Sequence, residues 1–178
     1  MNAGAIEIRR LAAADAPLFR DIRLEGLQRD PDAFGSTFER ESTEPLSFFV
    51  QRLEDSAVFG AFEGDALIGV AGFAVQAGAK HAHKGLLWGM YVRPDFRGSG
   101  IGRRLVERGV DHARGRVELI QLVVISENLA ARRLYRGLGF EEYGLERHAA
   151  KYRDRYHDDV LMAKMLIDFG SDPAAEAH

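Results

Sequence analysis

The clearest chemical pattern in the sequence is a set of alternating glycines in RPDFRGSGIGRRLVE, residues 93–107. Gly98, Gly100 and Gly102 follow an apolar, strand-like run and open a segment with helical periodicity. Glycines let successive backbone N–H groups point at one anion, and a helix N-terminus adds about half a positive charge at the same place. The pattern therefore predicts a loop that binds phosphate or pyrophosphate.

Two common phosphate-binding patterns do not fit this loop. A dinucleotide fold needs GxGxxG directly after a strand, whereas Arg103 stands in the place of the third glycine and residues 93–97 intervene. The Walker pattern fails because no GK[ST] follows. A plain glycine-rich turn is the remaining alternative, but each glycine costs a helix roughly 0.5–1 kcal/mol. What remains is Arg97 ahead of a glycine-rich helix start.

The charge distribution supports an anionic ligand. Residues 93–116 hold seven arginines against three acidic residues, whereas the rest of the chain has 17 basic and 24 acidic residues. No basic block is interleaved with aromatic residues, so we expect no nucleic-acid partner. A small anionic molecule fits the basic segment better.

Length and composition predict one globular domain. With 178 residues, 46% of them hydrophobic, the chain can bury a core but is short for two domains. We expect residues 1–168 to form a single domain and residues 169–178 a flexible tail. The absence of cysteine excludes disulfides, thiolate metal sites and a cysteine nucleophile. The apolar runs are strand-length and no signal-peptide core is visible, so we expect a soluble, cytoplasmic protein without a membrane partner.

Apolar periodicity predicts alternating strands and helices around the glycine loop. Strands are expected at 6–9, 57–62, 67–75, 86–92, 117–125, 140–149 and 156–167, and helices at 15–27, from Thr43 to about 53, from the glycines to 113, and at 129–138. Residues 30–41 are expected to be irregular. This order indicates an α/β protein with a mixed sheet and helices on its faces.

Two sequence blocks resemble the GNAT N-acetyltransferase superfamily. VRPDFRGSGIGRRLVE is similar to its acyl-CoA-binding signature, R/QxxGxG/A, and NLAARRLYRGLGF, residues 128–140, is similar to its NxxAxxLYxxxGF block. In element order the likeness spans roughly residues 6–167. The resemblance implies the GNAT acyl-CoA N-acyltransferase fold, a mostly antiparallel sheet of about seven strands with about four helices and a splayed strand pair. It also implies acetyl-CoA (coenzyme A) as cofactor, and relatives are often homodimers.

The resemblance assigns roles to residues near the splayed strands. Its cofactor-binding residues are Met90, Tyr91, Val92, Arg97, Gly98, Ser99, Gly100, Ile101, Gly102, Arg103, Asn128 and Tyr135. Tyr135 would be the general acid for the departing thiolate, and Asn128 would hold the cofactor arm or a water. These two residues are seven apart, so on a helix they are expected to look out from one face. The alternative is an asparagine that caps the helix and a half-buried tyrosine.

The sequence does not identify the general base. An alkylamine with a pKa of about 10.4 is almost fully protonated at pH 7, so some group must accept its proton. Many relatives keep a glutamate on the strand before the glycine loop, but here that strand, GLLWGMYV, has no acid. A water chain ending at Glu39, Glu41, His81, His83 or Asp158 is left open. The two histidines have no third ligand in register, so we predict a solvated turn and no metal.

For the acceptor, DPDAFGSTFEREST resembles the connection between the first two helices of small-molecule acetyltransferases in this superfamily. The candidate substrate-binding residues are Phe34, Phe38, Glu41, Trp88 and Tyr156, with Glu39 as an alternative to Glu41 for attracting a cation. The alternative is that the aromatic residues belong to the core and the acids to a hydrated face.

Three functions remain open. The favoured one is acetyl transfer from acetyl-CoA to the primary amine of a small molecule, by direct attack in a ternary complex. The second is acetylation of a protein N-terminus or lysine, which would need an open, shallow groove. The third is a non-catalytic acyl-CoA sensor, against which Asn128 and Tyr135 argue. A dehydrogenase is disfavoured by the glycine register, and the acceptor, the acyl chain length and the oligomeric state stay open.

Overall fold

The computed structural model describes residues 5–168. Residues 1–4 and 169–178, and with them the expected C-terminal tail, lie outside the described residues. The described chain forms a seven-stranded sheet of order β1-β2-β3-β4-β5-β7-β6, parallel at β4/β5 and antiparallel elsewhere. The strands are β1 Ile6–Arg10, β2 Ala57–Glu63, β3 Ala66–Val75, β4 Lys84–Val92, β5 Leu119–Ile125, β6 Glu141–Tyr152 and β7 Arg155–Met165. The predicted mixed, mostly antiparallel sheet is confirmed.

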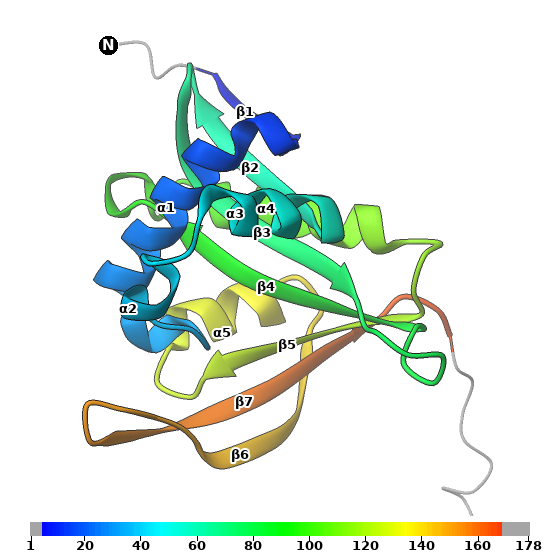
Figure 1. Cartoon of the computed structure of the whole chain (residues 1–178). Coiled ribbons are helices and arrows are strands. Elements are labelled where there is room, and N and C mark those ends of the chain that lie inside the picture. Colours follow the sequence, from blue (N-terminus) through cyan, green and yellow to red (C-terminus); the bar gives the residue numbers. More distant parts are fainter. Residues whose placement is uncertain (1–4, 169–178) are drawn as a thin grey trace, which may run out of the picture.

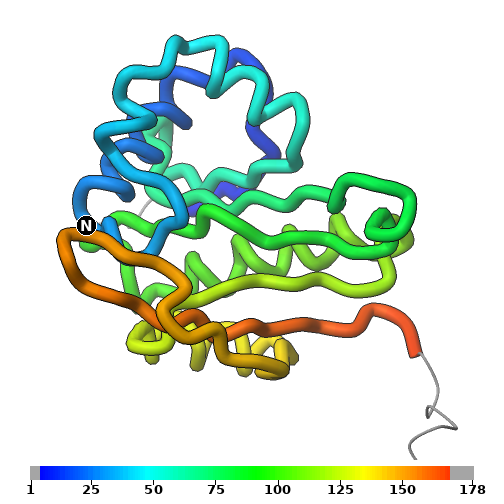
Figure 2. The backbone as a smooth tube through the Cα atoms, turned by 60° about the horizontal axis from the view of Figure 1, so that its bottom comes forward, coloured from blue at the N-terminus to red at the C-terminus, as the bar shows by residue number. Residues whose placement is uncertain are grey.

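Helices cover both faces of this sheet (Figures 1 and 2). In the described chain they are α1 Ala16–Arg29, α2 Phe38–Glu41, α3 Leu46–Asp55, α4 Ile101–Ala113 and α5 Leu129–Arg136. Helices α1 and α3 pack together, and α1 also contacts β3 and β4. Helix α4 packs on β2, β3 and β4, from the opposite face of the sheet (Figure 2).

Two separate apolar clusters fill the spaces between the sheet and its helices. The cluster under α1 and α3 includes Phe19 and Phe49, and the cluster under α4 includes Leu105 and Phe73. Because both faces are covered, β2 and β3 are buried along most of their length. This explains why AVFGAFE and ALIGVAGFAV are almost continuously apolar instead of alternating.

Strands β4 and β5 are neighbours at one end only. Their pairing joins Lys84–Leu86 to Leu119–Gln121, and beyond these positions the strands separate, as Figure 1 shows. A β-bulge lies in β4 after the paired segment, where Gly89 and Met90 together lie opposite Ala71. Gly89 has a φ of 63°, in the left-handed region that favours glycine. Such a bulge bends the strand and turns the groups beside it. The predicted pair of splayed strands is therefore present, as β4 and β5.

Differences from the expected elements have local causes. Residues 30–41 are not wholly irregular, because they contain a 3₁₀ turn, Pro31–Ala33, and the short helix α2. The Thr37 side chain caps α2 by accepting a hydrogen bond from the N–H of Arg40. Helix α3 begins after Pro45 and is not capped by Thr43, whose hydroxyl instead donates to the Arg40 carbonyl oxygen at 2.8 Å.

A buried charge cluster ties the first three helices together. Glu41, at the end of α2, is fully buried and accepts hydrogen bonds of 2.9 and 2.8 Å from Arg23 of α1. Arg52 of α3 approaches the same carboxylate at 3.6 Å and stacks over the ring of Trp88. Burial by itself raises the pKa of Glu41, but the interactions with Arg23 and Arg52 outweigh it and hold the pKa below its ordinary value. The cluster fixes the chain between α1 and α3.

We expect Glu41→Gln to lower the free energy of unfolding by about 3–5 kcal/mol, because Arg23 would remain buried without its counter-charge. Urea denaturation at pH 7 measures this change. Because the folded-state pKa of Glu41 is depressed, its stabilisation is present above the unfolded pKa and is lost as the pH falls through the folded one. The difference between wild type and E41Q should therefore shrink in acid.

The matched control is Glu39→Gln, since Glu39 is an exposed residue of the same helix. Its substitution should change the free energy of unfolding by less than about 0.5 kcal/mol. If E41Q were as stable as E39Q at pH 7, the cluster would have no structural role.

Candidate active site

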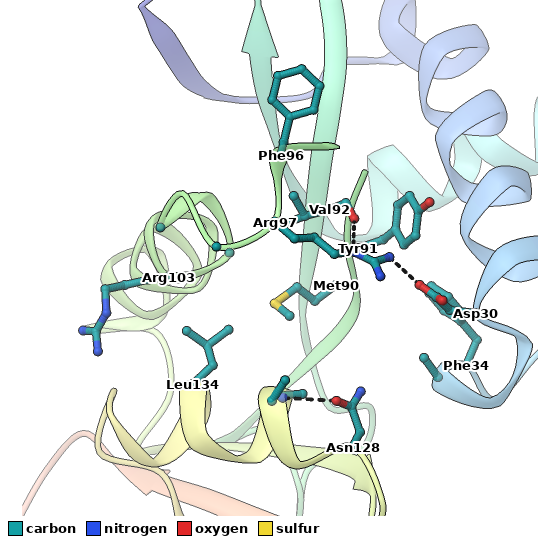
Figure 3. Close-up of a pocket in the computed structure, with 16 residues that line it drawn as sticks. Asp30, Phe34, Met90, Tyr91, Val92, Phe96, Arg97, Arg103, Asn128 and Leu134 are labelled. Atoms are coloured by element: carbon teal, nitrogen blue, oxygen red, sulfur yellow. Dashed lines mark hydrogen bonds and ion pairs between the residues drawn. The ribbon is translucent and has the colours of Figure 1, made fainter. Parts of the chain in front are cut away.

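A cavity of about 610 Å³ lies where β4 and β5 separate, between the N-terminus of α4 and helix α5 (Figure 3). It is lined by Asp30, Ala33, Phe34, Met90, Tyr91, Val92, Phe96, Arg97, Gly98, Gly100, Gly102, Arg103, Asn128, Ala130, Ala131 and Leu134. Its volume is in the range of ordinary ligand sites. One end is basic and rich in glycine, and the wall formed by α5 is largely apolar.

The glycine loop has the geometry of an anion cradle. Gly98 and Gly100 have φ values of 78° and 84°, and a Cβ added at either would meet nothing within 4 Å. Gly100 is the N-cap residue of α4 and offers no side-chain cap. The N–H groups of the first turn of α4 therefore lack intrahelical partners, and they open toward the cavity at its basic end. Donors of this kind, reinforced by the helix dipole, suit a phosphate group.

Arg97 lies beside this cradle. Its Nε donates to the Val92 carbonyl oxygen at 2.8 Å, and its guanidinium forms an ion pair with Asp30 at the end of α1 (Figure 3). The guanidinium also lies over the Tyr91 ring, 5.5 Å from its centroid. Arg97 thus joins the end of β4 to the end of α1 at the cavity wall.

Not all residues of the predicted cofactor set line this cavity. Nine do: Met90, Tyr91, Val92, Arg97, Gly98, Gly100, Gly102, Arg103 and Asn128. The Ser99 hydroxyl donates back to the Phe96 carbonyl oxygen, and the Ile101 side chain is buried in the core under α4. The third exception is Tyr135, which is described next.

The spacing of Asn128 and Tyr135 predicted that both side chains point outward from one face of a helix. In the structure they do not. The Asn128 side chain caps α5 by accepting a hydrogen bond from the N–H of Ala131 at 3.1 Å, and it also borders the cavity (Figure 3). Tyr135 is 8% exposed and packs edge-on against Phe140. Its hydroxyl donates to the sulfur of Met90, at 3.7 Å, and Met90 lines the cavity. Burial raises the pKa of Tyr135 to about 12, so its proton is retained at neutral pH.

A second, smaller cavity adjoins the first. Its volume is about 250 Å³, and Ala33 and Phe34 line both cavities. It lies between the connection from α1 to α2 and strands β5 and β7, with Val123, Ile125, His157 and Asp159 contributed by the two strands. His157 is 3% exposed, and neither of its ring nitrogens has a hydrogen-bond partner within the described chain.

The predicted substrate residues are placed differently from one another. Phe34 lines both cavities, whereas Phe38, Glu41, Trp88 and Tyr156 line neither. Glu41 is held in the ion cluster with Arg23, and Trp88 packs in the cluster under α1 and α3. Tyr156 is 54% exposed and stacks on His148. An acidic residue that is needed to neutralise a buried arginine cannot also serve a ligand, which is why Glu41 is unsuited to attract a cation.

The proton-accepting candidates from the sequence also lie away from both cavities. Glu39, Glu41, His81, His83 and Asp158 line neither of them. The turn with both histidines precedes β4, at the end where β4 and β5 are still paired. Asp158 is engaged by the N–H of His148 at 2.8 Å. Within residues 5–168 no group of histidine and acidic side chains could hold a metal ion.

Sequence reasoning missed several residues that the structure brings to these cavities. Asp30, Phe96, Ala130, Ala131 and Leu134 border the larger one, and His157 and Asp159 border the smaller one. His157 and Asp159 are two residues apart on β7, so their side chains lie on one face of the strand. This spacing is the sequence signal from which the pair could have been found.

Comparisons with known proteins show the family of this chain. A family model described as the acetyltransferase (GNAT) family matches residues 22–140. The chain belongs to the GNAT acetyltransferase family. It is 32% identical over 142 residues to the N-alpha-acetyltransferase RimI of Mycobacterium tuberculosis, across 80% of this chain and 82% of that protein. It is also 32% identical over 138 residues to the mycothiol acetyltransferase of Thermobifida fusca, across 73% of this chain and 37% of that protein.

Solved GNAT structures share the fold. The ribosomal-protein-alanine N-acetyltransferase of Brucella melitensis superposes with a TM-score of 0.79 and 26% identity, covering 90% of this chain and 99% of that one. A putative acetyltransferase from Salmonella typhimurium, solved with its cofactor acetyl-CoA, also gives 0.79, with 21% identity and 96% and 99% coverage. The family, the fold and the acyltransferase class expected from the sequence are confirmed, and acetyl-CoA is the acetyl donor of this GNAT enzyme. No helix within residues 5–168 is long and apolar enough to cross a membrane.

We expect Gly100→Ala to weaken binding of coenzyme A at least about tenfold, because a Cβ would enter the anion cradle at a left-handed backbone position. Titration calorimetry with coenzyme A measures the affinity. Gly115→Ala is the matched control, since Gly115 has a φ of 73° and a similarly open surrounding just beyond the other end of α4. It should lose stability similarly and keep its affinity; equal affinities in the two variants would rule out the cradle.

Proposed function

We propose that this enzyme transfers the acetyl group of acetyl-CoA to the primary amine of a small molecule, by direct attack in a ternary complex. In this proposal the larger cavity binds acetyl-CoA and the smaller one takes the amine. The observation that carries it is the arrangement of two adjoining cavities with a shared wall at Ala33 and Phe34, one basic and glycine-rich and the other lined by carboxylates. Two substrates could then meet where the cavities adjoin.

The groups around the larger cavity fit acetyl-CoA. The first turn of α4, Arg97 and Arg103 would hold phosphate groups. The backbone of Met90 and Tyr91, which has no strand partner on the β5 side, would bind the amides of the cofactor arm. A fixed backbone donor near the thioester oxygen is commonly worth roughly 10²- to 10³-fold in rate. The unused donors of Asn128 are available to the same arm, because its oxygen already caps α5.

Tyr135 is the proposed general acid. Burial raises the pKa of Tyr135 to about 12, so the hydroxyl keeps its proton at neutral pH. That hydroxyl already donates a hydrogen bond to a sulfur atom, that of Met90. A departing thiolate near Met90 would accept the same proton. The weak hydrogen bond to Met90 is readily exchanged for a stronger one to a thiolate.

The small cavity favours a small amine over a protein substrate. The connection between α1 and α2 covers β5, and Asp32 of that segment lies 3.4 Å from His157 of β7, so this acceptor side is walled. A second candidate is the α-amine of a protein N-terminus. It is favoured by the names of the relatives RimI of Mycobacterium tuberculosis and the [ribosomal protein bS18]-alanine N-acetyltransferase of Escherichia coli, the latter 36% identical over 78 residues.

A thiol-release assay with acetyl-CoA distinguishes these functions. We expect small primary amines to give a higher kcat/KM than peptides with free N-terminal residues. The reverse order would favour a protein acceptor. Tight binding of coenzyme A without thiol release from any amine or peptide would indicate a non-catalytic sensor.

We expect Tyr135→Phe to lower kcat by about 10²- to 10⁴-fold while the affinity for acetyl-CoA changes little, because only the proton donor is removed. Steady-state kinetics and calorimetry measure the two quantities. Tyr143→Phe is the control, because Tyr143 is 55% exposed on β6 and lines neither cavity. Unchanged turnover in Y135F would remove Tyr135 from the mechanism.

A further inference from the structure

The smaller cavity contains a carboxylate that none of the roles above uses. Asp159 lies on β7, opposite Ile125 of β5 on one side and Glu146 of β6 on the other. It lines the cavity and is partly buried. Within the described chain no hydrogen bond or ion pair engages its side chain, whereas its neighbour Asp158 accepts a hydrogen bond from the N–H of His148. Asp159 is therefore available to a ligand.

His157 gives independent evidence that this cavity is built for a polar ligand. It lies two residues before Asp159, so both belong to the same face of β7. Its ring nitrogens lie 3.4 Å from Asp32 and 3.5 Å from Glu127, without hydrogen-bond geometry. A buried imidazole without a partner is costly, and a ligand or water in the adjoining cavity would satisfy it. Glu127 immediately precedes Asn128, so this cluster reaches the border of the larger cavity.

We propose that Asp159 binds the acceptor amine as its ammonium ion and takes the proton that must leave before the nitrogen can attack. This inference rests on the proposed function and supplies the base missing from β4. The strand GLLWGMYV offers no acid. The proton acceptors that the sequence left open line neither cavity; they are Glu39, Glu41, His81, His83 and Asp158. His157 lies between Asp32, in the segment after α1, and Glu127, in the segment before α5, on the same face of β7 as that carboxylate.

The proton balance of the reaction is complete with these groups. Asp159 takes one proton from the ammonium ion and later releases it to water. The neutral nitrogen forms a bond to the acetyl carbon, and the carbon–sulfur bond breaks. The sulfur receives a proton from Tyr135, which regains one from the nitrogen through solvent. The products are the N-acetyl amide and coenzyme A, with one proton released.

The surroundings of Asp159 suit this task. Burial, followed by the charge of Glu146 and then that of Asp158, raises the pKa of Asp159 above its ordinary value, while His157 opposes the shift. Lys151 and Asp32 are the other charged groups that line the cavity. A carboxylate with a raised pKa is a stronger base, and a bound cation favours its ionised form.

Asp159→Asn tests the inference, with 1,4-diaminobutane, n-butylamine and an alanyl peptide as probes. At pH 7 we expect kcat/KM for the best probe to fall by about 10²- to 10⁴-fold. The remaining activity should rise about tenfold per pH unit, because only the free amine would react. Wild type should instead level off above the pKa of Asp159. Affinity for coenzyme A should be unchanged, and calorimetry should show 1,4-diaminobutane binding to the coenzyme A complex weakened about ten- to a hundredfold.

Asp158→Asn is the matched control, because the asparagine oxygen can still accept the hydrogen bond from His148 and the side chain lines neither cavity. Asp159→Glu should restore part of the rate. If D159N does not fold, Asp159→Ser takes its place. The inference is overturned if D159N has the rate and pH profile of D158N, or if wild type does not bind 1,4-diaminobutane. If wild type binds this amine through Asp159 but acetylates no probe, the proposed function fails and the binding site stands.

Discussion

The separation of β4 from β5 is the constraint on which the rest of the structure depends. After three paired positions the two parallel strands diverge, and the backbone of Met90–Val92 has no strand partner on that side. Unpaired backbone groups inside a protein are costly unless a ligand or water satisfies them. The bulge at Gly89 and Met90 bends β4 where this happens. The cavity thus exists because β4 and β5 do not pair beyond these positions.

The side chains that line the two ends of that gap differ in charge. On one side, the glycine loop, Arg97 and the dipole of α4 favour an anion. On the other side, Asp159 and Asp32 favour a cation. Ala33 and Phe34 form the wall between them. Under the proposed function, an anionic acyl donor and a cationic acceptor would bind to one sheet from opposite sides of the same gap.

The buried cluster of Arg23, Glu41 and Arg52 holds the segment that borders both cavities. Because Glu41 is fully buried with its charge neutralised, the chain from α1 to α3 has little freedom at α2. The ion pair of Arg97 with Asp30 fixes the other end of the same segment to the glycine loop. Both contacts therefore anchor the segment that lines the two cavities.

The sequence by itself determined the glycine loop, the strand and helix order and the family, because these depend on local spacing: left-handed glycines before a helix, apolar periodicity, and a block with fixed intervals. Of the twelve residues that the sequence predicted to bind the cofactor, nine line the larger cavity. The surroundings of Glu41, Tyr135 and Asp159 were decided by tertiary structure. Glu41 is neutralised by Arg23 of another helix, 18 residues earlier. Tyr135 is buried against Phe140. Asp159 lines the smaller cavity together with Ile125, because β7 lies beside β5. Partners distant in sequence set the charge and burial of a side chain, and no local pattern records them.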